Sequence, residues 1–421
     1  MYIRKVEIKN IRSIADFSME FPEGKEAGWH VLIGDNGAGK STILQAMAMG
    51  LIGPGEVLRL NPTWESWVKK GQDQASIEII YRREDKPDLP DPIRSRNEAH
   101  ISLSVIRGGA DEPFFLEKAK GIWHEGGVIH KGKRFSCGFG PFRRFTGGDI
   151  LADDQTTPLT PFETLFKPEV ILTSSLTWIK DQYTRSFEKD KKAQEVLDIL
   201  KNLIASGGLL PNQLKIDKIT ADGVFFKDAD GVVLHITELS DGVKSILALT
   251  FELCRLLFDK YNIFEVNNYM LQNGVINVAG VVLIDEIDAH LHPTWQTRIG
   301  QWFTHYFPNL QFIVTTHSPL ICRGCLNEAG ELNGSIWRLA APGSKEISGL
   351  LDYTSRDRLL YGNVLDAYGT GVFGTTTSRS EEGNLKMNRL AELNVKSRIG
   401  AISKKEETEM HELKTIFPTH A

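Results

Sequence analysis

The residues with the clearest chemical potential form a glycine-rich stretch near the start of the chain, Gly34-Asp-Asn-Gly-Ala-Gly-Lys-Ser41. In this GxxxxGK[ST] pattern, backbone N–H groups turn toward phosphate oxygens, the lysine reaches the outer phosphates and the hydroxyl suits Mg²⁺. A glycine turn with no ligand is the simpler alternative. We predict a site for ATP and Mg²⁺, with Ser41 as a metal ligand. Its predicted contacts are Gly34, Asn36, Gly37, Ala38, Gly39, Lys40, Ser41 and Thr42.

Two adjacent carboxylates, Asp285 and Glu286, directly follow the apolar run Val281-Val-Leu-Ile284. Carboxylates at the end of a buried strand are costly unless the protein uses them. Asp285 would hold Mg²⁺ through water, and Glu286 would orient or activate the water that attacks the terminal phosphate. The pattern is weak evidence alone, but its place downstream of a phosphate loop makes Asp285 a predicted metal ligand and Glu286 a predicted catalytic residue.

Two more segments carry polar side chains at the ends of expected elements. Leu239-Ser-Asp-Gly-Val-Lys-Ser245 opens a predicted helix, and Thr316-His-Ser-Pro319 follows a predicted strand. Taken alone, Ser240 could be only a helix N-cap and His317 only a polar residue leaving a sheet. Their order relative to the phosphate loop and the carboxylate pair is what gives them functional interest.

Strands are expected where these residues need support. Residues 2–9 alternate apolar and charged side chains, and 29–33 form a short apolar run just before the glycine loop. Composition also predicts buried strands at 281–285 and 310–316. Helices are expected after the glycine loop and from about 241 to 259. The predicted fold class is α/β, with a mixed β-sheet core around the phosphate loop.

Further segments are expected around this core: an antiparallel β lobe, an insertion of loops, a short helical subdomain, a β-meander signalled by two Asp-Gly pairs, and a helix after Pro293. The β lobe lies at 76–82 with 101–107 and the loop insertion at about 83–165. The helical subdomain lies at about 176–210, the meander at about 214–237 and the helix at 295–306. Together they would form a head of residues 1–340. A small C-terminal helical region, 341–421, would follow, in which Ser403-Lys-Lys-Glu406 has the form of a capping box.

Composition excludes several classes for the 421 residues. No run of about 18 apolar residues could span a bilayer, and the first residues do not have the pattern of a secretory signal, so we expect a cytoplasmic protein with no membrane contact. Four cysteines do not make a disulfide framework. The CxxC pair Cys322 and Cys325 has no second pair at zinc-ligand spacing, so two small buried residues are the favoured interpretation.

The formal net charge of −5 argues against a globally basic nucleic-acid surface, but one local cluster mixes basic and aromatic residues. Two readings stay open, a DNA contact or a solvated loop with a few core aromatics. The basic members are Lys131, Lys133, Arg134, Arg143 and Arg144, and the aromatic members are Phe135, Phe139 and Phe142.

The order of the four motifs resembles that of the ABC-type ATPases: a phosphate loop, LSxGxxS, an apolar run with Asp-Glu, and a strand ending in histidine. The resemblance covers most of the chain, and the opening Asn10-Ile-Arg-Ser13 is similar to the soluble branch with the SMC, RecF and OLD-type ATPases. The runs 284–293 and 311–319 most resemble the PtuA family of ATPases, from the anti-phage Septu systems and their retron-associated relatives.

This resemblance implies a composite site. Such ATPases form head-to-tail dimers, so the phosphate loop of one subunit faces the LSxGxxS signature of the other. Ser240, Asp241, Gly242 and Lys244 would then contact nucleotide bound by the partner. His317 would act as a catalytic residue on the γ-phosphate in its own chain, and Arg12 is a further candidate contact to the phosphates.

The chain departs from the class pattern in two places. The position of the usual D-loop aspartate, six residues after Glu286, holds His292. No Q-loop glutamine is identified, and 137–144 lies roughly where the third contact on the metal side should come from. His290 and His292 lack further ligands at metal-site spacing, so packing is the favoured reading for both.

The leading hypothesis is an ATP-hydrolysing subunit of a bacterial anti-phage complex that regulates a separate nuclease, of HNH type, and has no nuclease activity of its own. A RecF-like DNA-repair ATPase is the first alternative. A nucleotide-gated binding module with negligible turnover is the second. The chain is expected to form a homodimer or larger homo-oligomer, with 341–421 contacting a partner or another subunit.

Overall fold

A computed structural model of the chain describes most of its residues and divides it into two compact units, Met1–Tyr361 and Gly362–Ala421. The described residues are 1–53, 57, 66–82, 98–107, 115–120, 135–145, 160–205, 208–261, 271–272, 274–341, 343, 347–368 and 380–417. Within them, no helix has the length and apolar character needed to cross a membrane.

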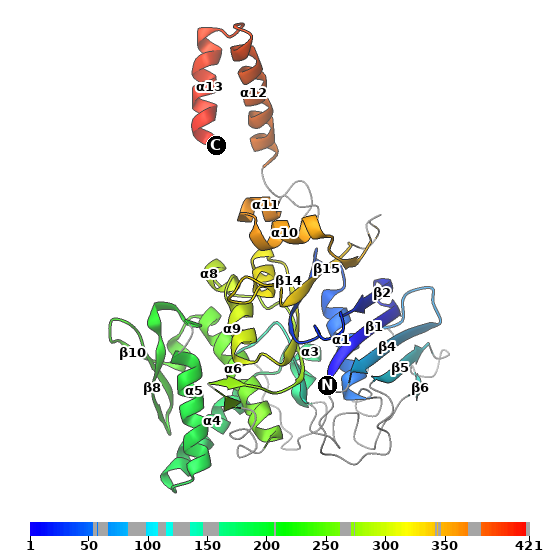
Figure 1. Ribbon diagram of the computed structural model, residues 1–421, viewed down its shortest axis with the longest axis vertical. Helices are drawn as coiled ribbons and strands as arrows, with labels where there is room; N and C mark the ends of the chain where they lie inside the picture. The colour runs from blue at the N-terminus through cyan, green and yellow to red at the C-terminus, as the bar shows by residue number, and fades with distance from the viewer. Residues whose placement is uncertain are drawn as a thin grey trace. The chain divides into compact units, whose positions relative to one another are not determined.

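The first unit is built around a six-stranded sheet in the order β16-β15-β3-β14-β13-β7 (Figure 1). The strands are β3 (Gly28–Gly34), β7 (Phe135–Phe139), β13 (Gly280–Ile284), β14 (Leu310–Thr316), β15 (Gly334–Leu339) and β16 (Gly349–Leu350). All pairs are parallel except β15 with β16. Every residue of β3, β13 and β14 is buried, which explains their nearly continuous apolar sequences.

A second, antiparallel sheet has the order β2-β1-β4-β5-β6. Its strands are β1 (Tyr2–Ile11), β2 (Ile14–Glu20), β4 (Gln74–Arg82), β5 (Glu98–Ile106) and β6 (Phe115–Lys120). Helix α1 (Lys40–Ile52) contacts both sheets, and 11 of its 13 residues are buried. Because side chains from α1 and from both sheets share one hydrophobic core, the helix that follows the phosphate loop is fixed from two sides.

Helices and a small meander complete the first unit. Their bounds are α3 (Glu163–Phe166), α4 (Thr173–Phe187), α5 (Lys191–Ala205), β8 (Lys215–Thr220), β9 (Gly223–Lys227), β10 (Val233–His235), α6 (Asp241–Lys260), β11 (Leu271–Gln272), β12 (Val275–Ile276), α8 (Pro293–Gln296), α9 (Ile299–Tyr306) and α10 (Tyr353–Tyr361). Helix α4 packs on α6 through Trp178 and Phe258, whose rings stack 6.0 Å apart. The predicted meander and the predicted helix from 241 are confirmed.

The sequence prediction differs from the structure in two segments. Residues 108–165 were expected to be loops, but β6 and β7 lie among them. The β7 sequence contains serine, cysteine and glycine, so its strand character comes from its parallel pairing with β13 and not from local preference. The single helix expected at 295–306 is instead divided into α8 and α9. The four cysteines are free and buried, as expected for Cys322 and Cys325.

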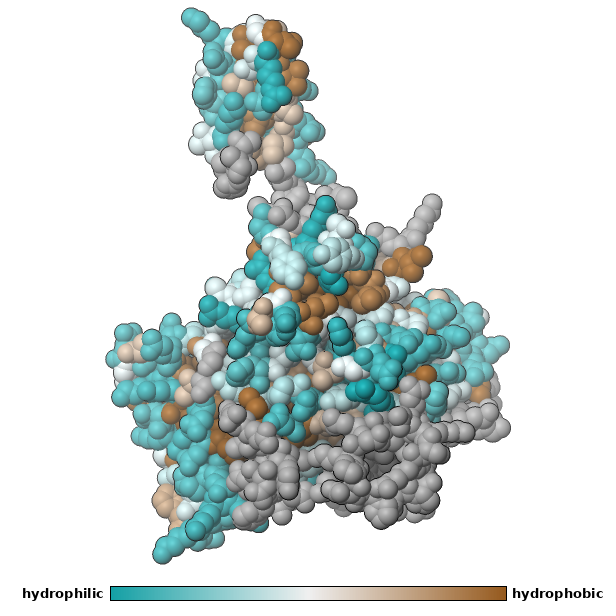
Figure 2. Space-filling view, viewed as in Figure 1, coloured by the Kyte–Doolittle hydropathy of each residue, from teal (hydrophilic) through white to brown (hydrophobic). Residues whose placement is uncertain are grey.

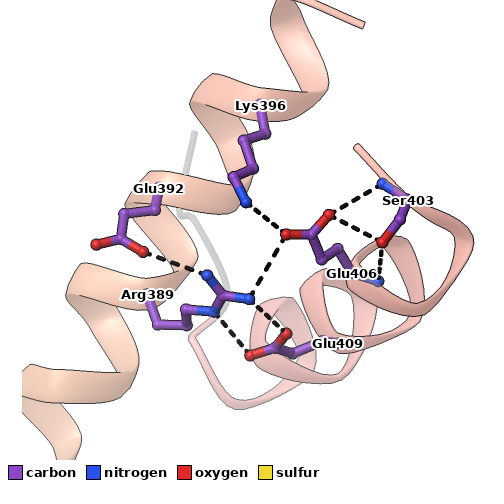
Figure 3. Close-up of polar contacts among 6 residues, drawn as sticks. All are labelled: Arg389, Glu392, Lys396, Ser403, Glu406 and Glu409. Atoms are coloured by element: carbon purple, nitrogen blue, oxygen red, sulfur yellow. Dashed lines mark hydrogen bonds and ion pairs between the residues drawn. The ribbon is translucent and has the colours of Figure 1, made fainter. Parts of the chain in front are cut away.

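The second unit contains α11 (Val364–Tyr368), α12 (Glu381–Arg398) and α13 (Lys404–Ile416). The helices α12 and α13 pack through Leu390, Leu393, Met410 and Leu413. The predicted capping box is confirmed at the start of α13, where Glu406 also accepts a hydrogen bond from Lys396 (Figure 3). That bond holds the pKa of Glu406 down to about 2. Figure 2 shows hydrophobic residues on the surface of this hairpin.

Candidate active site

The predicted functional residues converge because the strands that precede them are parallel. The phosphate loop follows β3, the carboxylate pair follows β13, and His317 follows β14. The carboxyl ends of neighbouring parallel strands meet at one edge of the sheet, where ligands of α/β proteins commonly bind. The register places Ile284 opposite Val314 and Thr316 opposite Ile33, so the three segments leave the sheet side by side.

The phosphate loop has the backbone geometry that its glycines suggest. Gly37 and Gly39 have positive φ values of 77° and 95°. A Cβ atom on Gly39 would also lie 3.1 Å from the Ile14 side chain, so a larger residue is disfavoured there by conformation and by space. The loop leads directly into α1, whose free N–H groups face the loop and suit an anion.

Lys40 is held inside this loop and is only 6% exposed. Its ammonium group donates to the carbonyl oxygens of Gly34 at 2.7 Å and Asp35 at 3.0 Å, and it contacts His317 Nδ1 at 3.3 Å. Burial lowers the pKa of Lys40, and the negative charge of Asp285 opposes that effect. The lysine is therefore poised beside the loop interior, where phosphate oxygens could replace the loop carbonyls as acceptors.

The carboxylate pair is anchored by Thr315 on the neighbouring strand. Thr315 Oγ1 donates to Asp285 Oδ1 at 2.5 Å and accepts from the Glu286 N–H at 2.7 Å. Asp285 is 4% exposed, and this bond fixes its carboxylate. Glu286 has a positive φ of 45°, an unfavourable conformation for a residue with a side chain. Such conformations persist only where surrounding contacts impose them.

One pocket of about 300 Å³ brings most of the predicted residues together. It is lined by Arg12, Ser13, Asn36, Gly37, Gly39, Lys40, Ser41, Thr42, Glu286 and His317. A glycine cradle, a buried lysine, a hydroxyl and the Glu286 carboxylate, with Asp285 next to it in the chain, are the groups that a nucleoside triphosphate with Mg²⁺ requires. The residues present therefore fit both ATP and the metal.

Arg12 reaches the same pocket from the end of β1. Its guanidinium lies over the Trp67 ring, 4.2 Å from the centroid, and donates to Gln45 Oε1 at 2.9 Å. Burial lowers its pKa. The side chain is thus held at the start of α1, close to Thr42, to which Nη1 donates at 3.5 Å.

The signature residues lie elsewhere on the molecule. Ser240, Asp241, Gly242 and Lys244 do not line the described pocket. Ser240 and Asp241 are exposed, and Asp241 pairs with Lys244 at 2.8 Å. A Cβ atom on Gly242 would lie 2.4 Å from the carbonyl oxygen of His290, so local packing alone already requires glycine at this position. These residues therefore take no part in the described pocket of their own chain.

Comparison with known proteins places the chain in a family. The sequence profile of the AAA domain family matches residues 5–230, more than half of the 421 residues. The chain belongs to the AAA domain family. A second AAA-domain profile, whose description also mentions the AbiEii toxin and type IV toxin–antitoxin systems, matches residues 152–323. Together with the motif order, this identifies an ABC-type P-loop ATPase close to PtuA proteins.

Two curated relatives extend the similarity. The chain is 28% identical to the Septu protein PtuA of Bacillus mycoides, over 90% of this chain and 44% of that protein. It is 26% identical to the Retron Ec83 probable ATPase of Escherichia coli, over 76% of this chain and 69% of that protein. This ATPase thus spans less than half the length of the first relative. Among solved structures, an SMC head bound to the C-winged helix domain of ScpA is 18% identical, with a TM-score of 0.47 over 83% of this chain and 97% of that chain.

The structure removes three members from the basic and aromatic cluster for which a DNA contact and a solvated loop were both open. Arg143 is only 4% exposed and points inward, and Phe135 and Phe139 are buried within β7. These three residues cannot meet DNA, because they form part of the core. Arg144 and Phe142 are exposed and contact each other, whereas Lys131, Lys133 and Arg134 lie outside the described residues.

The two departures from the class pattern occupy defined places. His292 caps α8, where its Nδ1 accepts from the Thr294 N–H at 3.4 Å. The stretch 137–144, expected to supply the third contact on the metal side, begins within β7. Because β7 pairs with β13, the end of β7 lies next to Asp285. Arg143 of this stretch carries a guanidinium, which has N–H donors and no acceptor atom, so this side chain offers no metal ligand.

Sequence reasoning missed the residues that support the ATPase site from neighbouring elements. Thr315 holds both carboxylate residues, Thr316 Oγ1 donates to Asp288 at 2.6 Å, and Gln45 holds Arg12. The adjacent threonines before His317 were a usable signal, because hydroxyls at the end of a buried strand need partners. Ser13, which follows Arg12, also lines the pocket.

Proposed function

We propose that this ATPase binds ATP with Mg²⁺ in the pocket at the carboxyl edge of the parallel sheet and hydrolyses it there. The observation that carries this proposal is the meeting of Lys40, Glu286 and His317 in one pocket, although they follow three different strands. Lys40 would bind the β- and γ-phosphates, and Ser41 and Asp285 would hold the metal ion, which neutralises charge on the phosphates. Arg12 and the loop N–H groups would complete the phosphate contacts.

Glu286 and His317 have separate roles in this proposal. Glu286 orients the attacking water and accepts its proton, while His317 donates a hydrogen bond to the γ-phosphate or the water. Phosphoryl transfer depends mainly on positioning and on electrostatic stabilisation, which suits side chains fixed by buried strands. The contacts of Thr315 with Asp285 and with the Glu286 N–H supply that fixation.

The hydrolytic site is proposed to be completed by a second copy of the chain, in a head-to-tail dimer. The exposed Ser240 and Asp241 at the start of α6 support this, because they lie outside the pocket that they would serve. The N-terminus of a 20-residue helix carries positive partial charge, which favours the γ-phosphate of a nucleotide held by the other subunit.

We also propose that the working protein belongs to an anti-phage complex in which ATP controls a separate nuclease. The similarity to a Septu protein and to a retron ATPase supports this role. The second unit is proposed as the contact to a partner or to another subunit, since Leu385, Val395 and Ile399 are 69%, 60% and 71% exposed there. Replacing these three with glutamate should leave ATP turnover unchanged and weaken co-purification with the proposed nuclease partner, or reduce the oligomer size.

The proposed activity is tested by comparing phosphate release by the wild-type chain with that by Glu286→Gln. We expect a loss of about 1,000-fold with ATP binding retained, because the substitution removes the base and keeps the shape of the side chain. Glu23→Gln, at an exposed glutamate, is the matched control. Equal rates for the wild type and Glu286→Gln would favour a binding module without turnover. Strong stimulation of the wild type by DNA would favour a repair ATPase.

A further inference from the structure

Arg143 is a buried cation bonded to three separate segments. Its guanidinium donates to the carbonyl oxygens of Gly140 at 2.9 Å, Asp285 at 2.7 Å and Glu286 at 2.9 Å, and to Ser245 Oγ at 3.2 Å. Burial lowers the pKa of Arg143 to about 10, so it stays protonated at neutral pH. A buried charge is tolerated where its donors are satisfied. The four hydrogen bonds of Arg143 supply that satisfaction.

The contacts around Glu286 show what this cation holds in place. The Glu286 main chain has a positive φ, and both of its polar groups are bonded. Its N–H donates to Thr315 Oγ1, and its carbonyl oxygen accepts from Arg143 and from the Ala289 N–H at 3.0 Å. Thr315 comes from the neighbouring strand, and Arg143 from the segment after β7. The direction in which the Glu286 side chain leaves the main chain therefore depends on both partners.

The fourth bond of Arg143 reaches the signature helix. Ser245 is 3% exposed and lies in the second turn of α6, close to the exposed start of that helix. The same start packs on the segment after Glu286, as the close approach of Gly242 to the His290 carbonyl oxygen shows. A shift of α6 would therefore move Ser245 relative to Arg143. It would thereby change the position of the guanidinium that donates to the Glu286 carbonyl oxygen.

We propose that Arg143 is a positioning residue that ties Glu286 to helix α6, so that contact of Ser240 and Gly242 with ATP on one partner prepares hydrolysis of the ATP held by this chain. The inference rests on the proposed head-to-tail ATPase site. In a symmetric dimer it links the two sites, because each chain gives its signature to one nucleotide and its glutamate to the other. Hydrolysis of one nucleotide is then faster when the other is also bound.

Ser245→Ala tests this link with the least disturbance, because it removes one hydroxyl and leaves Arg143 in place. Thr250→Val is the matched control, since Thr250 is another buried hydroxyl of α6 and its Oγ1 makes no hydrogen bond within the described part of the chain. Each change is made in the wild type and in Glu286→Gln, and single-turnover rates, ATP affinity and melting temperature are measured.

If Arg143 acts by positioning Glu286, the effects of Ser245→Ala and Glu286→Gln on the rate should not add. Ser245→Ala should lower the rate about 10-fold in the wild type and less than about twofold in Glu286→Gln, with ATP affinity unchanged within about twofold. Arg143→Lys should show the same pattern with a loss of about 100-fold, since lysine cannot make all four bonds. Thr250→Val should change neither rate.

Three results would overturn the link. They are an equal loss in both backgrounds, no loss from Ser245→Ala or Arg143→Lys, and a loss of the same size from Thr250→Val. The proposed function is judged first, from the wild type against Glu286→Gln. If those two rates are equal, the ATPase proposal fails and the role of Arg143 fails with it; if they differ, the Ser245 comparison decides the link alone.

Discussion

The proposed site has two halves, which differ in the burial of their residues. The phosphate-loop half contains the loop at 34–41 with Glu286 and His317, and the signature half contains residues 240–244. Lys40 is 6% exposed and lies among carbonyl oxygens, with Glu286 and His317 in the same pocket. Asp241 at the start of α6 has a side chain that is 78% exposed, and its ion pair with Lys244 lies at the surface. The first half is organised by buried strands, and the second lies exposed at the surface.

This difference supports the proposal that one chain binds a nucleotide and depends on assembly for turnover. A buried, pre-arranged cradle gives binding to the single chain, because little has to be ordered when the ligand arrives. An exposed helix N-terminus contributes only when a γ-phosphate is brought to it. Changes to the phosphate cradle, such as loss of Lys40, should therefore affect binding. Changes to Glu286 or His317, or to the second half, should affect turnover with binding retained.

The largest expected effect comes from Lys40→Ala in the phosphate-loop half. It removes the cation that meets the outer phosphates, and we expect ATP affinity to fall about 100-fold and turnover to become undetectable. Titration with a fluorescent ATP analogue measures the affinity. Lys25→Ala, at an exposed lysine, is the control and should bind as the wild type does. Unchanged affinity in Lys40→Ala would place the nucleotide elsewhere.

A smaller effect is expected from His317→Ala, which separates chemistry from binding within the same half. His317 follows β14 and contacts Lys40, so its loss should lower kcat roughly 10- to 100-fold through weaker charge stabilisation in the transition state. ATP affinity should change by less than about threefold. Phosphate release at saturating ATP measures kcat, and a large loss of affinity with kcat unchanged would assign His317 to binding.

The support of the phosphate-loop half should also respond to acid, through His30 in β3. His30 is fully buried, and its Nε2 bonds the Glu26 carbonyl oxygen while its Nδ1 bonds Ser335 Oγ, both at 2.8 Å. Burial lowers the pKa of His30 from 6.5 to about 4. The unfolded chain therefore takes up the proton first, and stability is lost as the pH falls from 6.5 toward 4, by about 3 kcal/mol from this group.

Thermal or urea unfolding of the wild type and His30→Gln between pH 7 and pH 4.5 measures this dependence. The variant should be less stable at pH 7 and should lose less stability on acidification. The exposed His411→Gln should follow the wild type. Parallel curves for His30→Gln and the wild type would show that another group causes the acid sensitivity.

The sequence predicted the phosphate-loop half well because its signals are local. The glycine positions, the apolar run before them and the helix formers after them are all contiguous, and β3, the loop and α1 follow in that order. The capping box at Ser403 was predictable for the same reason. The roles assigned to individual site residues remain predictions until they are tested.

Other features were not predictable because they depend on pairing between distant segments. Strand β7 forms through β13, which lies far along the chain, and Arg143 is buried only because that pairing places it beneath Asp285 and Glu286. From the sequence, an arginine among glycines and phenylalanines leaves open both a DNA contact and a solvated loop with core aromatics. Thr315 likewise shows its role only when β14 lies beside β13.

The most direct test of the composite site is a mixing experiment with Lys40→Ala and Ser240→Arg. Each variant alone leaves every site of its own dimer defective, and both should be inactive. In a mixed dimer, the intact phosphate loop of Ser240→Arg meets the intact signature of Lys40→Ala, which forms one complete site. The mixture should therefore recover turnover above that of both parents. Random pairing sets an upper limit of about a quarter of the wild-type rate, and loss of the proposed link to the second site lowers this recovery by up to about 10-fold. A mixture as inactive as its parents, or a Ser240→Arg chain as active as the wild type, would contradict the account.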